Sequence, residues 1–147
     1  MRAARMMSRM KWICCAVVIC VTALTLAHAA EDDPCRDKQS NVDKRLCYTQ
    51  HQTKVNTEAD SLAQAISIGL RKEADSQQAT APPAASELRK AASALTRSQR
   101  AWRTYRDQYC EAIMRWIIGS GGGTIHEKCM YILGRQRVDE LHSDFPE

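Results

Sequence analysis

Few side chains in this 147-residue sequence have the types and spacings needed for chemistry. His51, His126 and His142 are not at metal-ligand spacings, and neither G-x-S-x-G nor H-E-x-x-H occurs. His126 and Glu127 lie close to Cys129 and could suggest a thiol nucleophile, but a disulfide explains Cys129 more simply. We therefore predict a non-enzyme without catalytic residues.

Four cysteines follow the N-terminal segment: Cys35, Cys47, Cys110 and Cys129. An even number of cysteines in a small exported domain predicts two disulfides. Three pairings are possible, and the simplest joins sequence neighbours, Cys35 to Cys47 and Cys110 to Cys129. A zinc site is the alternative, but no C-x-x-C spacing occurs and an exported compartment favours oxidation. We expect no metal and no other cofactor.

The N-terminus has the pattern of a cleaved secretory signal peptide over residues 1–29. Four basic residues precede an apolar run over residues 12–27, and Ala27-His28-Ala29 provides a cleavage motif. The apolar run is short for a membrane span, although an uncleaved anchor remains the alternative. Ile19 before Cys20 argues against lipidation. We expect a mature domain, residues 30–147, that is periplasmic or secreted in a bacterium and has no stable membrane span after cleavage.

Removal of the signal changes the charge of the protein. Four of the 21 basic residues lie in the signal, which leaves 17 basic and 17 acidic residues in the mature domain. The basic isoelectric point of the whole chain is therefore no argument for a nucleic-acid partner. We expect a protein partner and no nucleic acid.

A long amphipathic helix that ends near Trp116 is expected to organise the core. On an ideal helical wheel its apolar residues fall within about one third of the circumference. These residues are Leu88, Ala91, Leu95, Trp102, Tyr109, Ile113 and Trp116, with Tyr105 at the edge. We predict that the core packs against this stripe.

Arg106 lies near the middle of the same apolar face. A buried guanidinium requires an acidic partner and several acceptors. One interpretation is a structural ion pair, for example with Glu58 or Asp60 of an earlier helix. The other is an arginine that faces a ligand.

A glycine-rich turn, G-S-G-G-G over residues 119–123, follows this helix. The T-x-x-E pattern from Thr124 to Glu127 predicts a capping box at the start of a return helix. A phosphate-binding loop is not expected, because a preceding strand and a following Lys-Ser or Lys-Thr pair are missing. We predict that the turn contacts a partner, through the residues Ser120, Gly121, Gly122 and His126.

The N-terminal half of the mature domain also has helical periodicity. Ser40 or Asn41 can cap a helix in which Val42 and Leu46 share a face. A second stripe is out of phase with that face and comprises Val55, Ala59, Leu62, Ile66 and Leu70. Either the helix breaks between residues 50 and 56, or its two halves bury different faces.

Pro82 and Pro83 place a loop over residues 76–85, after which Ser86 is expected to cap the next helix. A last helix is predicted to end before Pro146, with an apolar set of Ile125, Cys129, Ile132, Leu133 and Leu141. The predicted fold class is all-α, a small bundle or hairpin of three to four helices braced by two disulfides.

A Q-R-x-W-x-x-Y-R-D-x-x-C pattern is formed by Gln99, Arg100, Trp102, Tyr105, Arg106, Asp107 and Cys110, and it is followed by Gly121, Gly122, Cys129 and Arg137. At these positions the sequence resembles the lysozyme inhibitor LprI-like N-terminal domain family. The front half agrees more loosely, at Cys35, Asn41, Cys47, Leu62 and Leu70. Ala63, Ile66 and Gly134 depart from the residues expected there, which are Asn, Tyr and Thr.

The resemblance implies a small secreted helical domain with paired cysteines, in which Trp102, Tyr105, Arg106 and Asp107 form a structural motif. It also implies inhibition of a lysozyme-type peptidoglycan hydrolase through protein binding. The alternative is an envelope interaction or stress protein, without catalytic activity, whose partner is not a lysozyme.

Overall fold

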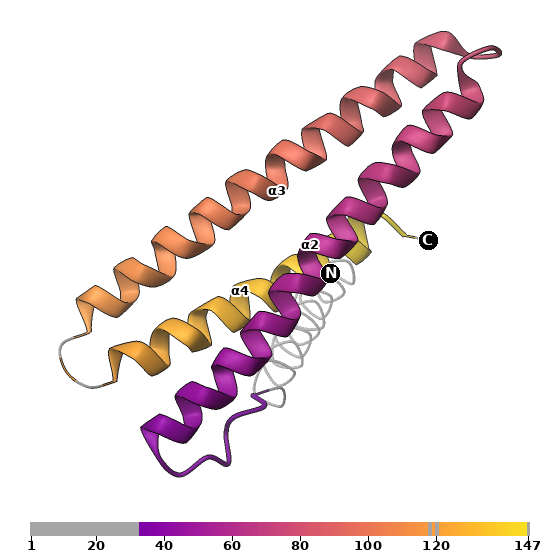
Figure 1. Ribbon diagram of the computed structural model, residues 1–147. Coiled ribbons are helices and arrows are strands. Elements are labelled where there is room, and N and C mark those ends of the chain that lie inside the picture. The colour runs from indigo at the N-terminus through magenta and orange to yellow at the C-terminus, as the bar shows by residue number, and fades with distance from the viewer. Residues whose placement is uncertain (1–32, 118, 120, 147) are drawn as a thin grey trace, which may run out of the picture. The chain divides into compact units, whose positions relative to one another are not determined.

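Three helices account for most of the chain that the structure describes (Figure 1). The structure, a computed structural model, describes residues 33–117, 119 and 121–146. Its helices are α2 (Asn41–Gln77), α3 (Pro82–Trp116) and α4 (Gly122–Asp144), and the described residues contain no strand. Disulfides join Cys35 to Cys47 and Cys110 to Cys129. The predicted fold class and the sequence-local pairing are thus confirmed, whereas the predicted signal lies outside the described residues.

Helix α2 runs without a break for 37 residues. Ser40 is its N-cap, and the Ser40 side chain accepts a hydrogen bond from the backbone N–H of Asp43. Val42 and Leu46 are exposed, so the face that they share is not a second buried face. One stripe of buried residues extends along the helix: Tyr48, Val55, Ala59, Ala63, Ser67 and Ala74. The pattern of Val42 and Leu46 is out of phase with the second pattern because these two residues do not lie on the buried stripe.

Helix α3 begins earlier than predicted, at the two prolines themselves. Pro82 and Pro83 occupy the first turn, with Ala81 as the N-cap, so the prediction of a helix start at Ser86 is wrong. The first backbone N–H groups of a helix have no intrahelical acceptor, and proline has none to lose there. The loop between α2 and α3 is correspondingly short, over residues 78–81.

Helix α4 turns back along the other two helices and packs against both. Leu141 of α4, Ala63 of α2 and Leu95 of α3 form a buried cluster, which Phe145 covers. The helix ends at Asp144, before Pro146, as predicted. Ile132, one of the apolar residues that indicated this helix, is exposed. No helix in the described part of the chain is long and apolar enough to cross a membrane.

Beyond the C-terminal end of α4, α2 and α3 continue side by side as a two-helix hairpin (Figure 1). We call residues 60–104 the arm, which includes the hairpin tip and the segment where Ala63, Leu95 and Gln99 contact the end of α4. The base comprises residues 35–59 and 105–146, including both disulfides. Ala74, Ala85 and Ala92 are fully buried in the outer part of the arm, where small side chains let the two helices approach closely.

Candidate protein-binding surface

Gln99, the first residue of the Q-R-x-W-x-x-Y-R-D motif, connects the three helices in the interior. Its Nε2 donates a hydrogen bond to Asp60 Oδ1 of α2 at 3.0 Å. Its Oε1 accepts a hydrogen bond from Arg137 Nε of α4 at 2.9 Å. A buried amide with both ends paired in this way fixes the relative positions of the helices.

Arg106 is buried, with 8% of its surface exposed, as its position on the wheel suggested. The predicted partners Glu58 and Asp60 are wrong. Arg106 donates from Nε and Nη2 to Oδ1 of the adjacent Asp107, at 2.8 and 2.6 Å, and its Cζ lies 4.9 Å from the ring centroid of Trp102. These contacts occupy the guanidinium within the protein and favour the structural interpretation.

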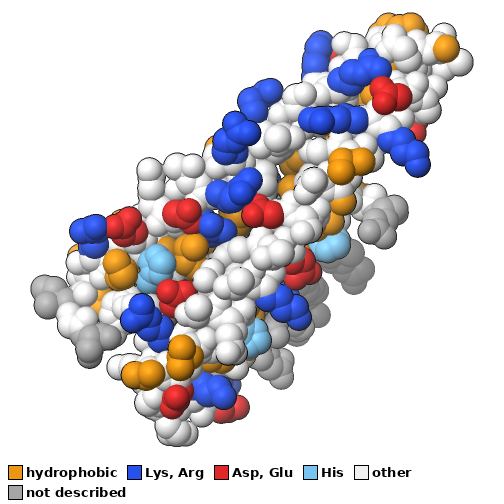
Figure 2. Space-filling view, viewed as in Figure 1, with side chains coloured by type: hydrophobic (Ala, Val, Ile, Leu, Met, Phe, Trp, Pro, Cys, Tyr) orange, Lys and Arg blue, Asp and Glu red, His pale blue; other side chains and the backbone are white. Residues whose placement is uncertain are grey.

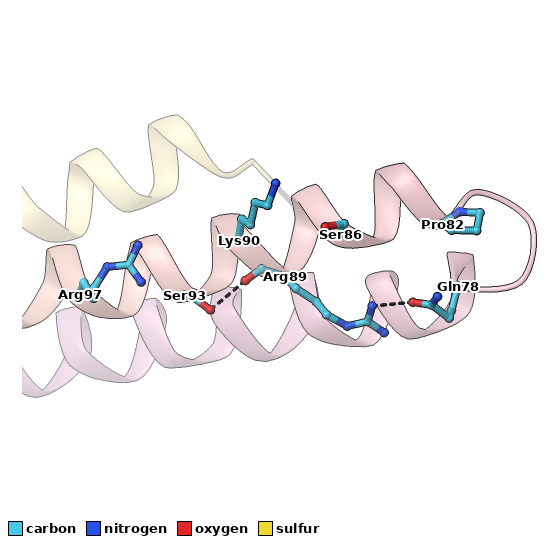
Figure 3. Close-up of a pocket in the computed structure, with 7 residues that line it drawn as sticks. All are labelled: Gln78, Pro82, Ser86, Arg89, Lys90, Ser93 and Arg97. Carbon is cyan, nitrogen blue, oxygen red and sulfur yellow. Dashed lines mark hydrogen bonds between the residues drawn. The ribbon is translucent and has the colours of Figure 1, made fainter.

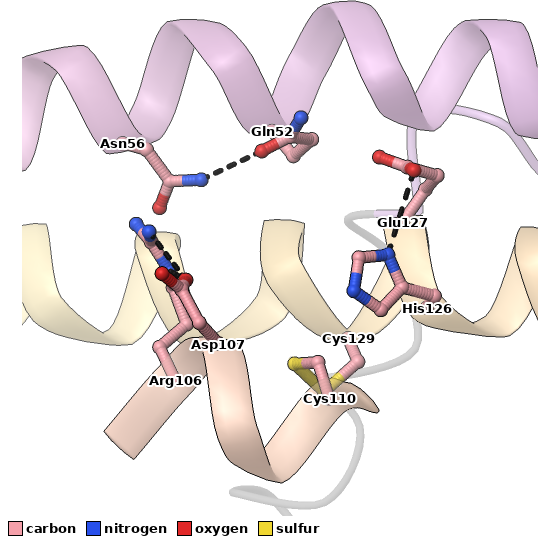
Figure 4. Close-up of a disulfide and its surroundings, with 8 residues drawn as sticks. All are labelled: Gln52, Asn56, Arg106, Asp107, Cys110, His126, Glu127 and Cys129. Carbon is pink, nitrogen blue, oxygen red and sulfur yellow. Dashed lines mark hydrogen bonds and ion pairs between the residues drawn. A yellow bond between two sulfur atoms is a disulfide. The ribbon is translucent and has the colours of Figure 1, made fainter. Parts of the chain in front are cut away.

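Asp60 and Asn56 of α2 complete this interior region. Asp60 Oδ1 lies 3.4 Å from Nε of Arg103, so this carboxylate pairs with a different arginine from the one predicted. The amide oxygen of Asn56 points toward Arg106 (Figure 4), is buried, and has no hydrogen-bond partner among the described residues. Its amide nitrogen donates to Gln52 at 2.8 Å.

The disulfide between Cys110 and Cys129 joins α3 to α4 next to this network (Figure 4). Its Cα atoms are 5.6 Å apart, and Cys110 is fully buried. The bridge fixes one helix against the other where they form a shared groove. The inward-facing side of the motif from Gln99 to Cys110 therefore holds the three helices together.

The outer side of the same segment forms a groove between α3 and α4, which we call the aromatic groove. It has a volume of about 500 Å³ and is lined by Tyr105, Tyr109, Ile113, Ile125, Lys128, Cys129, Ile132, Leu133 and Gln136. Tyr105 and Tyr109 are 53% and 46% exposed, and their rings stack with centroids 5.5 Å apart. Accessible aromatic rings beside aliphatic side chains are typical of protein-binding surfaces.

These exposed aromatic residues correct the predicted core. Tyr109 and Trp116 were placed on the buried stripe of α3, but Trp116 is 83% exposed, Ala91 is exposed and Trp102 is only half-buried. Four of the six residues that α3 buries recur every seven positions, at Ala85, Ala92, Gln99 and Arg106, and the other two are Leu95 and Cys110. The predicted residues Leu88, Leu95, Trp102, Tyr109 and Trp116 recur at the same spacing, three positions further along. Spacing alone therefore does not identify the buried face.

The glycine turn lies at one end of the aromatic groove, after Trp116. Gly119 has a φ of 118°, which favours glycine, and Ser120 lies outside the described residues. Gly121 is half-buried and Gly122 is buried. A Cβ on Gly122 would lie 3.1 Å from the backbone oxygen of Met114, so a larger residue would fit poorly there. Partner contact by these residues stays a prediction.

The predicted capping box does not form at the start of α4. The helix begins at Gly122, with Gly121 as the N-cap, and the Thr124 hydroxyl instead donates to the backbone oxygen of Asn41 at 3.0 Å. This bond attaches the turn to the start of α2. His126, also predicted to contact a partner, is half-buried, with Nδ1 3.5 Å from Glu127 Oε1 (Figure 4).

A second cluster of polar and aromatic residues surrounds the disulfide between Cys35 and Cys47. Tyr131 packs against Tyr48 and His51, with ring centroids 6.3 and 5.9 Å apart. Ligand atoms of Cys35, Cys47 and His51 lie within 4.8 Å of one another, which is close enough for a metal site. Both sulfurs are joined in the disulfide, however, and metal-binding cysteine requires a free thiolate. These residues therefore brace the start of α2.

The fold and the groove together define a class of small all-α domain, braced by disulfides, that presents an aromatic surface. The chain belongs to the family described as Lysozyme inhibitor LprI, which matches residues 35–141. The match covers all three helices except the last three residues of α4. No curated protein and no solved structure matches the chain.

Proposed function

We propose that this chain is an extracytoplasmic, non-catalytic domain that inhibits a lysozyme-type peptidoglycan hydrolase by binding to it. The observation that carries the proposal is the exposed aromatic groove, present in a member of a family described as a lysozyme inhibitor. The two disulfides support an oxidising compartment, consistent with the signal peptide expected over residues 1–29. We assign the groove as the surface that meets the hydrolase.

Tyr105 and Tyr109 supply large, amphipathic rings whose side chains lose little conformational freedom on binding. Their backbone is held by α3, which the Cys110–Cys129 disulfide fixes against the opposite wall of the groove. A surface that is ordered before binding loses less entropy when the complex forms. Trp116 is 83% exposed at the end of α3 and comes seven residues, or about two helical turns, after Tyr109, which places it near the same face of the helix. The turn would then enter or cover the substrate cleft of the hydrolase.

Charge supports binding through the base rather than through the arm. The arm contains seven basic and four acidic residues, whereas the described part of the base contains ten basic and nine acidic residues. Lysozymes are typically cationic, so the positive arm would repel such a partner more strongly than the nearly neutral base would. We therefore expect inhibition that depends mainly on apolar contact and changes little with salt concentration.

The test is inhibition of several lysozyme types by the oxidised protein, measured with a soluble oligosaccharide substrate so that coating of cell walls cannot imitate inhibition. Tyr105→Ser combined with Tyr109→Ser should weaken inhibition by about 30-fold or more, the loss typical of a binding hot spot. The matched control is Val42→Ser combined with Ile68→Ser, which removes two exposed apolar side chains elsewhere and should leave inhibition unchanged.

Equal losses in the two double variants would contradict the assignment of the groove. If every lysozyme type stayed fully active with micromolar wild-type protein, the inhibitor proposal would fail. The groove would then serve the alternative function, binding to an envelope protein other than a lysozyme.

A further inference from the structure

The arm differs from the rest of the protein in the sign and arrangement of its charges. Five basic residues of α3 lie in the arm: Arg89, Lys90, Arg97, Arg100 and Arg103. On an ideal helix they fall within about 140° of the circumference and span about 21 Å along the axis. Figure 2 shows Lys and Arg side chains along the edge of the molecule that α3 forms. The arm therefore presents a linear array of cations.

Two surface clefts accompany this array. The cleft at the tip, of about 430 Å³, is lined by Gln78, Pro82, Ser86, Arg89, Lys90, Ser93 and Arg97 (Figure 3). The second, of about 600 Å³, lies between α2 and α3, and Arg71 and Arg103 are among its lining residues. Hydroxyl groups and guanidinium groups in these clefts can donate hydrogen bonds to anionic oxygens.

Most of these cations are available to a ligand. Arg97 and Arg100 make no ion pair within the part of the chain that the structure describes, and both are exposed. Arg89 pairs with Asp75 at 2.9 Å and Lys90 with Glu87 at 2.7 Å, but all four side chains are largely exposed to solvent. Exposed ion pairs contribute little to stability, so an anionic ligand can replace these partners at low cost.

We propose that the arm binds a linear anionic polysaccharide of the cell envelope, with carboxylate-bearing peptidoglycan as the ligand. An array of this length is suited to successive charges of a polymer, and four of its five cations are arginines, which bind carboxylates in a bidentate manner. This binding is independent of the proposed inhibition and would hold the protein at the polymer that hydrolases cleave.

The composition of the arm favours a polymer over a membrane. Proteins that lie on bilayers insert large apolar side chains next to their basic residues. Ile68 on α2 is the one large apolar residue of the arm that is strongly exposed among the described residues, and the basic face of α3 has none. A nucleic-acid ligand would require a different compartment from the one that the two disulfides favour.

The experiment is co-sedimentation of the oxidised protein with purified peptidoglycan sacculi, without any lysozyme. Sacculi whose carboxylates have been amidated serve as the second binding target. The test variant is Arg97→Gln with Arg100→Gln. The control, Arg36→Gln with Lys54→Gln, removes the same charge from exposed positions of the base.

We expect binding to native sacculi that is lost on amidation and weakens as salt rises. The test variant should bind about 25-fold more weakly, since each basic residue at an anionic surface contributes on the order of fivefold in affinity. The control should bind like the wild type. Unchanged binding to amidated sacculi, equal losses in both variants, or tighter binding to phosphatidylglycerol vesicles or to a DNA oligonucleotide would each overturn the proposal.

Discussion

The arm and the base are built from the same two long helices but are stabilised in different ways. Disulfides and a buried arginine in the base, and the Gln99 hydrogen bonds where the base meets the arm, hold α2, α3 and α4 together. In the outer arm, two helices meet through alanines and one buried serine, Ser67, whose hydroxyl lies 3.4 Å from the backbone oxygen of Ala92. The base can therefore expose apolar rings at a fixed geometry, while the surface of the arm is left to charges.

The largest expected effect of a substitution is in the base, at the disulfide between α3 and α4. Cys110→Ala combined with Cys129→Ala should lower the free energy of unfolding by about 3 kcal/mol, because the bridge closes a loop of 19 residues. Urea denaturation of the oxidised proteins measures this. The arm control Ser93→Ala should change stability by less than about 0.5 kcal/mol. Similar losses in the free energy of unfolding for the two variants would mean that the base and the arm do not differ in how they are stabilised.

The second prediction compares two glycines, one in each region. A Cβ on Gly134 of α4 would lie 2.6 Å from Val55 Cγ2 and 2.7 Å from Asn56 Oδ1. Gly134→Ala should therefore destabilise the base by about 1–3 kcal/mol, as overpacking does.

Gly69 of the arm is the matched control, because a Cβ there meets nothing within 4 Å. Gly69→Ala should stabilise the protein by about 1 kcal/mol through helix propensity alone. Thermal and urea unfolding of both variants should show changes of opposite sign. A stabilising Gly134→Ala would mean that α4 does not approach α2 as closely as described.

The smallest expected effect concerns an ion pair of the arm. Asp75→Asn removes the carboxylate that faces Arg89, and both side chains are mostly exposed. The free energy of unfolding should fall by less than about 1 kcal/mol. The same change should strengthen binding to sacculi, because it removes the carboxylate that pairs with Arg89 and makes the net charge of the arm more positive by one. Weaker binding of this variant would contradict the electrostatic description of the arm.

The sequence predicted the elements of this fold better than their faces. Cysteine count and spacing, the Ser40 cap and the end of α4 before Pro146 all depend on local chemistry, and the structure confirms each. The phase of α3 is not local. Leu88, Leu95, Trp102, Tyr109 and Trp116 recur every seven positions, but so do the buried Ala85, Ala92, Gln99 and Arg106, and local sequence does not show which set meets the other helices. The larger apolar side chains favoured the first set, and Trp116 was therefore placed on the wrong face.

The polar residues of the interior, and their partners, also could not be predicted from the sequence. Gln99 is buried because it bonds to both Asp60 and Arg137, and neither contact can be seen from neighbouring sequence. Arg106 was expected to pair across helices, whereas it pairs with the adjacent Asp107 and packs on Trp102. Gly134, a departure from the family pattern, is explained by the close approach of α4 to Val55 and Asn56. The aromatic groove could not be predicted while its tyrosines were assigned to the core.

Hydroxyl-radical footprinting of the protein, free and bound to an inhibited lysozyme, tests most directly whether the base docks on the hydrolase. The method labels exposed aromatic side chains, and Tyr105, Tyr109 and Trp116 are all exposed in the free protein. If the base docks on the hydrolase, these three residues should be strongly protected in the complex, and the labelling of Pro82 and Ile68 in the arm should not change. Protection confined to the arm, with the three aromatic residues still labelled, would contradict docking through the base.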